Sequence, residues 1–244
     1  MKLKDDISKL WNDSDKNAIK GILFMTVVVA VYFYFGIHEF FAKTFPHTNN
    51  LDYWKYIYHN FTPIILFFAL GIVFVKFVLK ADLKDFGLGP GDIKTGLKIC
   101  LVLTPIMVLA GLTAVFDKGM NTTYPLPRYV IYAPAKYALL YYVSYIAYYI
   151  GWEFLFRGIG IFSFKKDNAL MAIAVSTMIS ALIHSSIAGF GKPLAETFSA
   201  IPAGIAFGYV AYKTRSVWYG FYLHSLVGFS TDFLIAVFIR NGLI

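Results

Sequence analysis

Residues 97–116 read LKICLVLTPIMVLAGLTAVF, and Lys98 is the one charged residue among them. A helix rises about 1.5 Å per residue, so roughly 20 residues of this kind cross the hydrocarbon core of a bilayer. Lipid offers no hydrogen-bonding partner to the backbone, and a spanning segment therefore has to be a helix or part of a closed barrel. The stretch predicts a transmembrane helix.

Other apolar segments of similar length lie on both sides of this stretch. They run over residues 21–37, 60–80, 131–164, 168–190, 194–212 and 216–239. The segment 131–164 is long enough to be tilted, or to include a short helix before Lys136 that would supply an eighth element. Short alternating strands, which a barrel needs, are absent from the sequence. We therefore predict an all-α fold, a polytopic membrane helix bundle of seven to eight transmembrane helices.

The composition supports a membrane protein. Of the 244 residues 58% are apolar and 15% charged, against about half and a quarter in soluble domains. This balance excludes a disordered chain and an ordinary soluble globule, and the single cysteine, Cys100, excludes an internal disulfide. The net charge of +8 comes from basic clusters between apolar runs. We assign these clusters to topology and contact with anionic lipid, and we expect no nucleic-acid partner.

Charge distribution also predicts the orientation and the domain organisation. With the N-terminus in the cytoplasm, 15 of the 22 Lys and Arg residues fall on the inner side, as the positive-inside rule requires. Residues 1–20 are expected to be cytoplasmic, either as an amphipathic helix or as a frayed terminus. Residues 21–244 are expected to form one integral domain in the cell inner (plasma) membrane. Segments 38–59 and 117–130 are expected to be loops, with solvated histidines in the first.

Ionisable residues inside membrane helices are costly and usually functional. Near the last four predicted spans these residues are Glu153, Arg157, His184, Glu196, His224 and Asp232. Glu153 and Arg157 are four residues apart and share a helix face. They form either an internal ion pair or a functional pair, in which Glu153 is a base or positions water and Arg157 is a structural clamp. Glu196 precedes a small-residue stripe, Ala200, Gly204 and Gly208, and lies either at the aqueous interface or at a cavity mouth.

His184 and His224 each lie in a long apolar run. A single helical histidine is usually a hydrogen-bonded core residue, but two imidazoles and a carboxylate on a third helix can activate water without a cofactor. The same trio is compatible with part of a zinc shell. Because the His-Glu-x-x-His spacing is absent, we predict neither a metal nor a cofactor. Counted from the inner ends of the spans, His184 lies roughly 9–12 Å above the level of Glu153 and His224.

The stretch 151–158, GWEFLFRG, resembles the first motif, Glu-Glu-x-x-x-Arg, of the CPBP (CaaX protease and bacteriocin-processing) family, also called Abi. The resemblance continues with a second-motif histidine, His184, and with the stretch KPLAE at residues 192–196. A third-motif histidine, His224, follows the run Ser-Val-Trp at residues 216–218. The likeness covers residues 147–236. It implies an intramembrane helix bundle whose proteolytic members are glutamate-dependent endopeptidases, and whose bacterial relatives act in bacteriocin maturation or self-immunity.

By this resemblance, Glu153 and His184 would activate water and His224 would polarise the scissile carbonyl, with Arg157 as a clamp. Three positions depart from the family pattern. Trp152 stands where the first glutamate is expected, Ser180 replaces a phenylalanine, and Gly228 replaces the asparagine or aspartate of the third motif. Neighbouring helix residues point about 100° apart, so Glu153 reaches the missing carboxylate's place only in a rotated or bulged helix.

We expect Trp152, Glu196 and Gly228 to line the cavity, and we expect membrane lipids and a peptide or protein substrate as partners. The resulting hypothesis is an intramembrane endopeptidase of the CPBP type, with diverged or lost activity. The alternative is a catalytically inactive relative that acts in bacteriocin immunity, scaffolding or peptide binding. A proton-relay transporter is a third hypothesis, although no repeated half or discontinuous helix is visible.

Overall fold

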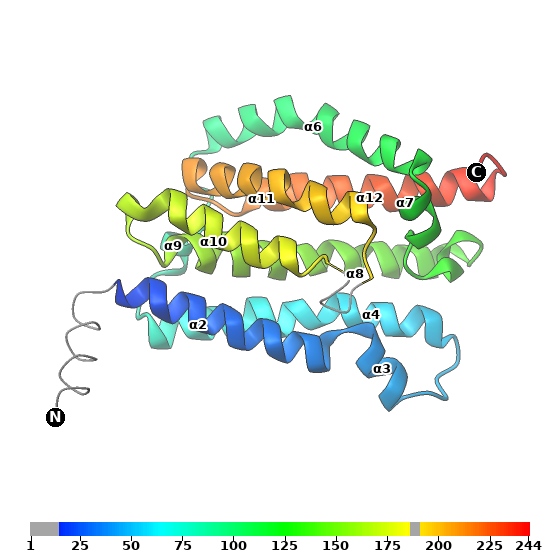
Figure 1. Ribbon diagram of the computed structural model, residues 1–244, viewed down its shortest axis with the longest axis horizontal. Helices are drawn as coiled ribbons and strands as arrows, with labels where there is room; N and C mark the ends of the chain where they lie inside the picture. Colours follow the sequence, from blue (N-terminus) through cyan, green and yellow to red (C-terminus); the bar gives the residue numbers. More distant parts are fainter. Residues whose placement is uncertain (1–14, 186–190) are drawn as a thin grey trace.

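The computed structural model describes residues 15–185 and 191–244, and each regular element in them is a helix (Figure 1). This confirms the all-α prediction. The α-helices are α2 (Lys16–Val31), α3 (His38–Thr44), α4 (Leu51–Pro63), α5 (Leu70–Val73), α6 (Ile93–Phe116), α7 (Lys118–Thr123), α8 (Ala135–Glu153), α9 (Gly160–Phe162), α10 (Ala169–Leu182), α11 (Leu194–Thr214) and α12 (Trp218–Arg240). The π-helical turns are η1 (Tyr32–Gly36), η2 (Ile64–Ala69), η3 (Phe74–Val78) and η6 (Phe154–Ile159). The 3-10 turns are η4 (Leu83–Phe86), η5 (Arg128–Ile131) and η7 (Lys166–Asn168).

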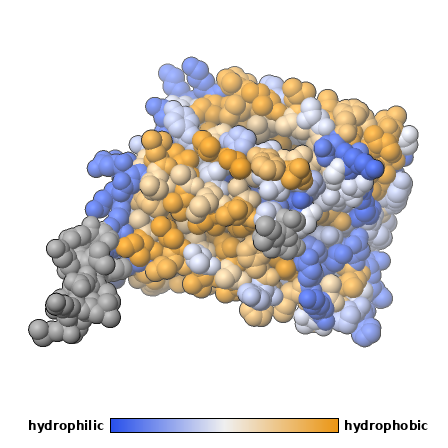
Figure 2. Space-filling view, viewed as in Figure 1, coloured by the Kyte–Doolittle hydropathy of each residue, from blue (hydrophilic) through white to orange (hydrophobic). Residues whose placement is uncertain are grey.

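The long helices lie side by side along the long axis of the molecule. In Figure 1, α2 and α4 form one edge, α8 and α10 the middle, and α11 and α12 the next layer, which α6 covers. Figure 2 shows hydrophobic residues over the middle of the visible face and hydrophilic residues towards both ends of the long axis. Large side chains on the outer helices are exposed, for example Leu101 at 77% and Phe77 at 75%. This distribution is the one expected of a bundle surrounded by lipid.

Within the described residues, five helical runs are long and apolar enough to cross a membrane. They are Lys16–Gly36, Leu51–Val78, Ile93–Phe116, Leu194–Thr214 and Trp218–Arg240. The predicted segments 131–164 and 168–190 correspond to the continuous run α8–η6–α9 and to α10, which are not among the five. The count of seven to eight therefore stays a prediction. Of the predicted N-terminal segment 1–20, residues 1–14 lie outside the described part, and Asp15 caps α2 by accepting a hydrogen bond from the Ala18 amide at 3.3 Å.

The prediction of a loop over residues 38–59 is wrong. It holds α3 and the first nine residues of α4, and a single helical run continues from residue 51 to residue 78. The polar residues at its start do not mark a loop, because this helix buries Tyr53, Ile57 and His59. His59 is 4% exposed, so the expectation of a solvated histidine is wrong as well.

Helix α8 is the centre of the bundle and packs against two neighbours. It runs parallel to α4, where Tyr53 Oη donates to the Tyr137 carbonyl at 2.9 Å and Asn60 Nδ2 donates to Ser144 Oγ at 3.0 Å. On its other side it runs antiparallel to α12, and the Tyr141 hydroxyl donates to Asp232 Oδ2 at 2.5 Å. Tyr141, Tyr145, Tyr149 and Glu153, spaced four apart along α8, are all buried.

The predicted small-residue stripe packs closely against a neighbouring helix. A Cβ added at Gly204 would lie 2.8 Å from Thr177, and one added at Gly208 would lie 3.0 Å from Ile173. Both contacts are to α10, so the expectation of close helix packing is confirmed. In Figure 1, α10 lies beside α11 over the length of these contacts. His184, just beyond α10, lies in the wall of the same cavity as His224, so the difference in depth expected from residue counting does not separate the two histidines.

We predict that Gly151→Ala destabilises the bundle. The added Cβ would lie 2.4 Å from the Pro63 carbonyl oxygen, a backbone atom that cannot turn aside. Overpacking of this kind costs about 1–3 kcal/mol. Thermal unfolding in detergent measures the effect, and Gly89→Ala is the matched control because its Cβ would meet its nearest atom at 3.4 Å. Equal stability of the two variants would contradict the close contact of α4 and α8.

Candidate functional site

The change from α-helix to π-helix in the middle of the chain positions a buried ion pair. Glu153 is the last residue of α8, and Arg157 lies in the π-helical turn η6 that follows. Glu153 is 0% and Arg157 2% exposed, and Arg157 Nη1 lies 3.2 Å from Glu153 Oε1. A π-turn inserted in an α-helix is frequent at functional sites because it changes the direction of the side chains around it.

Glu153 also holds one of the two predicted histidines. His224 Nδ1 lies 2.7 Å from Glu153 Oε1. A carboxylate accepts, so Nδ1 carries the proton and donates. The other ring nitrogen, Nε2, is then free to act in the cavity that His224 lines. Glu153 Oε2 is buried without a hydrogen-bond partner among the described residues, and such an atom in a native structure calls for a functional or solvent-based explanation.

The second histidine has the same arrangement of its ring nitrogens. His184 follows α10, and its Nδ1 lies 2.7 Å from the Ser180 carbonyl oxygen. Because a carbonyl accepts, Nδ1 carries the proton and leaves Nε2 as a base in the neutral ring. Nε2 lies 3.9 Å from Glu196 Oε1. Ser180, at the position where the family pattern has a phenylalanine, thus fixes the ring through its backbone.

The Glu196 carboxylate interacts with two polar side chains, one through an ion pair and one through a hydrogen bond. Lys192 Nζ lies 3.1 Å from Glu196 Oε1, and the Tyr124 hydroxyl donates to Glu196 Oε2 at 2.7 Å. Lys192 also donates to the Tyr124 hydroxyl. Burial, and secondly the Glu196 carboxylate, raise the pKa of Tyr124 well above its ordinary value. Tyr124 therefore stays protonated and remains a donor to the carboxylate.

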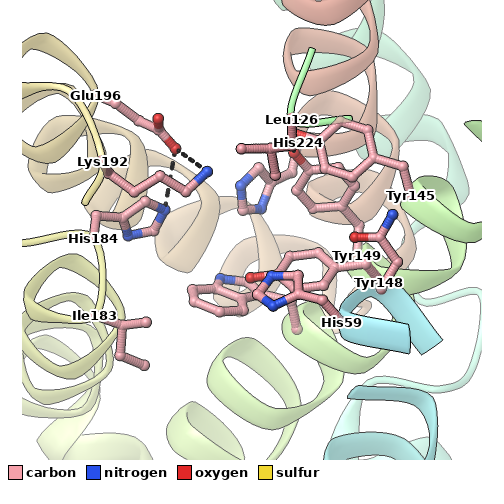
Figure 3. A pocket seen from close by; sticks show the side chains of 12 residues that line it. His59, Leu126, Tyr145, Tyr148, Tyr149, Ile183, His184, Lys192, Glu196 and His224 are labelled. Atoms are coloured by element: carbon pink, nitrogen blue, oxygen red, sulfur yellow. Dashed lines mark hydrogen bonds and ion pairs between the residues drawn. The ribbon is translucent and has the colours of Figure 1, made fainter. Parts of the chain in front are cut away.

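These groups surround one small cavity, shown in Figure 3. The lining residues are His59, Asn60, Leu126, Tyr145, Tyr148, Tyr149, Trp152, Ile183, His184, Lys192, Glu196 and His224. In Figure 3, Glu196, Lys192 and His184 face His224 and the tyrosines across the open space. Of the predicted site residues, Trp152, Glu196, His184 and His224 are therefore brought together. Glu153, Arg157 and Gly228 are not among the lining residues, and Glu153 reaches the cavity through His224.

Trp152 occupies part of the cavity wall between the two sides of the site. Its ring stacks on Tyr148 with centroids 5.3 Å apart and meets the His184 ring edge-on at 5.5 Å. Its Nε1 is buried without a hydrogen-bond partner among the described residues. Trp152 thus places an aromatic wall where the family pattern places a carboxylate.

Some lining residues could not be found from the motifs. His59 and Asn60 come from α4, outside the motif region 147–236. The prediction of a loop over residues 38–59 kept His59 out of the predicted site. Tyr149 carried a weak signal, because it precedes Glu153 by one helical turn. Asp232 lies away from the cavity wall and accepts from Tyr141. Within residues 15–185 and 191–244, His, Cys, Asp and Glu side chains form no group of three or more that could hold a metal ion.

Comparison with known families agrees with the motifs. The model of the family described as "Type II CAAX prenyl endopeptidase Rce1-like" matches residues 134–230. The matched segment contains both histidines, Glu153, Arg157 and Glu196. No curated protein and no solved structure matches the chain. The family match confirms the resemblance to the CPBP, or CAAX-protease, family.

We predict that Arg157→Met destabilises the protein by about 3–5 kcal/mol, because it leaves the Glu153 carboxylate buried without a countercharge. The double variant Arg157→Met/Glu153→Gln should recover much of this loss, since the unpaired charge is gone. Thermal unfolding of the set measures both effects. Lys84→Met, which removes an exposed ion pair to Asp82, is the control and should change stability little. A double variant less stable than Arg157→Met alone would contradict the pairing.

Proposed function

We propose, on the premise that residues 134–230 are an Rce1-like segment of the CAAX prenyl endopeptidase type, that this protein is a membrane endopeptidase. It would hydrolyse a peptide bond of a peptide or protein substrate at the membrane. The observation that supports this most is the pairing of each cavity histidine with a carboxylate, His224 with the buried Glu153 at 2.7 Å and His184 with the partly buried Glu196 at 3.9 Å.

His184 and Glu196 would activate the water. Their facing atoms, Nε2 and Oε1, both accept hydrogen bonds and cannot bond to each other. A water molecule can donate one hydrogen to each, at about 2.8 Å, when the two acceptors are close to 4 Å apart. As the water attacks the scissile carbonyl, His184 Nε2 takes its proton and later delivers it to the departing amine. The C–N bond breaks and one water is consumed.

His224 would stabilise the oxyanion, and Glu153 would orient it. The Glu153 carboxylate fixes the tautomer of His224 and stabilises its protonated form, as the buried aspartate does in a Ser-His-Asp triad. Protonated His224 then donates from Nε2 to the carbonyl oxygen as its negative charge develops. This assignment changes the predicted role of Glu153, from a residue that activates water to one that positions His224. Arg157 remains the clamp on Glu153.

The membrane setting follows from the sequence and the exposed apolar surface. We propose a single integral domain over residues 21–244, with seven to eight spans, a cytoplasmic N-terminus and a place in the inner (plasma) membrane. Lipids would surround the bundle. A CAAX-type peptide, which carries a prenyl group, is the substrate class that the family description suggests.

One observation favours a second function. Trp152 puts an aromatic ring where the family pattern has a carboxylate, next to His184. A relative that retains the cavity but has lost the chemistry could bind a peptide, act as a scaffold or confer bacteriocin immunity. It would bind peptide without hydrolysing it, and it would keep its role after His184→Ala.

The test is turnover of an internally quenched, farnesylated CAAX-type peptide by the purified protein in proteoliposomes. His184→Ala and Glu196→Gln should each lower kcat by about 10²- to 10⁴-fold, the range of general acid–base catalysis. His47→Ala and Asp82→Asn, at exposed positions, are the matched controls and should cleave like the wild type. Wild-type protein that binds the peptide without cleaving it would favour the second function, and full turnover by His184→Ala would exclude this mechanism.

A further inference from the structure

The space above Gly228 is filled by a side chain from another helix. A Cβ added at Gly228 would lie 2.1 Å from the hydroxyl oxygen of Tyr149 and 2.8 Å from its Cζ. Gly228 lies on α12, one turn beyond His224, and Tyr149 lies on α8. The absence of a side chain at 228 is therefore what lets the Tyr149 hydroxyl occupy this place.

The Tyr149 hydroxyl lies within reach of the position that an asparagine amide at 228 could take. From standard bond lengths, the amide nitrogen of an asparagine lies about 2.4 Å from its own Cβ. The Tyr149 hydroxyl, 2.1 Å from the Cβ position, is at nearly the same distance. Both groups are hydrogen-bond donors. A hydrogen-bond donor from α8 therefore stands at about the distance from position 228 that the amide of an asparagine there would have.

The surroundings of Tyr149 suit a donor that acts in the cavity. Its ring lies beside that of His224, with centroids 4.4 Å apart, and it forms part of the cavity wall. Its hydroxyl is hydrogen-bonded to the Tyr145 hydroxyl at 2.9 Å. Each hydroxyl can both donate and accept. When Tyr149 donates to a substrate, Tyr145 can therefore become the donor to Tyr149.

We propose that Tyr149 is a catalytic residue of this protein, whose hydroxyl donates a hydrogen bond to the oxyanion together with His224. This inference rests on the proposed endopeptidase function. The water adds to the scissile carbonyl carbon, the carbonyl oxygen becomes negative, and Tyr149 keeps its proton throughout as a donor. No covalent bond to Tyr149 forms or breaks.

The first test compares Tyr149→Phe with the wild type on the farnesylated CAAX-type peptide. The variant keeps the ring against His224 and removes the donor, so kcat should fall by about 100- to 1000-fold, the usual effect of losing one oxyanion donor. KM should stay within about threefold, because the bond forms in the transition state. Tyr142→Phe is the matched control. It removes a hydroxyl from the same helix, where the ring packs edge-on against Phe229.

The second test moves the donor back to α12. Tyr149→Ala removes the ring and should be as impaired as Tyr149→Phe. Adding Gly228→Asn to Tyr149→Ala should restore kcat at least tenfold, because the amide now has room. Gly228→Asn alone should be impaired, since its side chain would collide with Tyr149. Thermal unfolding in detergent identifies any variant that has lost its fold. The kcat values of Tyr149→Ala and of the double variant are compared once both are shown to be folded.

The outcomes separate this inference from the proposed function. If the wild type cleaves and Tyr149→Phe cleaves within threefold of it, the inference is overturned and the endopeptidase remains. Equal kcat of Tyr149→Ala and the double variant also overturns it. If the folded wild type cleaves no peptide of this class, the proposed function fails and the role of Tyr149 fails with it.

Discussion

The charge of Glu153 in the middle of an apolar bundle is the constraint on which the rest of the structure depends. A carboxylate that is 0% exposed is tolerated only with a countercharge and hydrogen-bond donors. Arg157 supplies the charge and His224 supplies the donor, each from a different part of the chain. Three features stabilise this one carboxylate. They are the π-helical turn after Glu153, the close contact of α8 with α12, and the orientation of His224.

The contact of α8 with α12 explains why small residues stand at particular positions. The two helices run antiparallel, and the residues that face α8 recur every fourth position on α12, at Gly220, His224, Gly228 and Asp232. A Cβ at Gly220 would lie 3.0 Å from Glu153 Oε2, and one at Gly228 would collide with Tyr149. Glycine at these two positions therefore makes room for functional groups of α8. The glycine at position 228, where the family pattern has an asparagine or aspartate, is thus part of the packing of α8 against α12.

Much of the fold could be predicted from the sequence, because long apolar runs have only one simple structure in lipid. The motifs also directed attention to His184, His224 and Glu196, which the structure brings into one cavity. The orientation of Glu153 could not be predicted, since a π-turn leaves no periodic signal and changes which neighbour the side chain meets. His59 was missed because the polar start of α4 has the composition of a loop. Residue counting could not predict that His184 and His224 line one cavity, because it assumes upright helices.

The most direct test of the central claim, that the cavity hydrolyses peptides with activated water, is mass spectrometry of the products formed in H₂¹⁸O. Purified protein in proteoliposomes would be incubated with the farnesylated CAAX-type peptide for one round of cleavage. We predict two products, with a single ¹⁸O atom in the new carboxyl terminus of one, and neither product with His184→Ala. Intact peptide after incubation with the folded wild type, or ¹⁸O-labelled products formed equally by His184→Ala, would contradict the account.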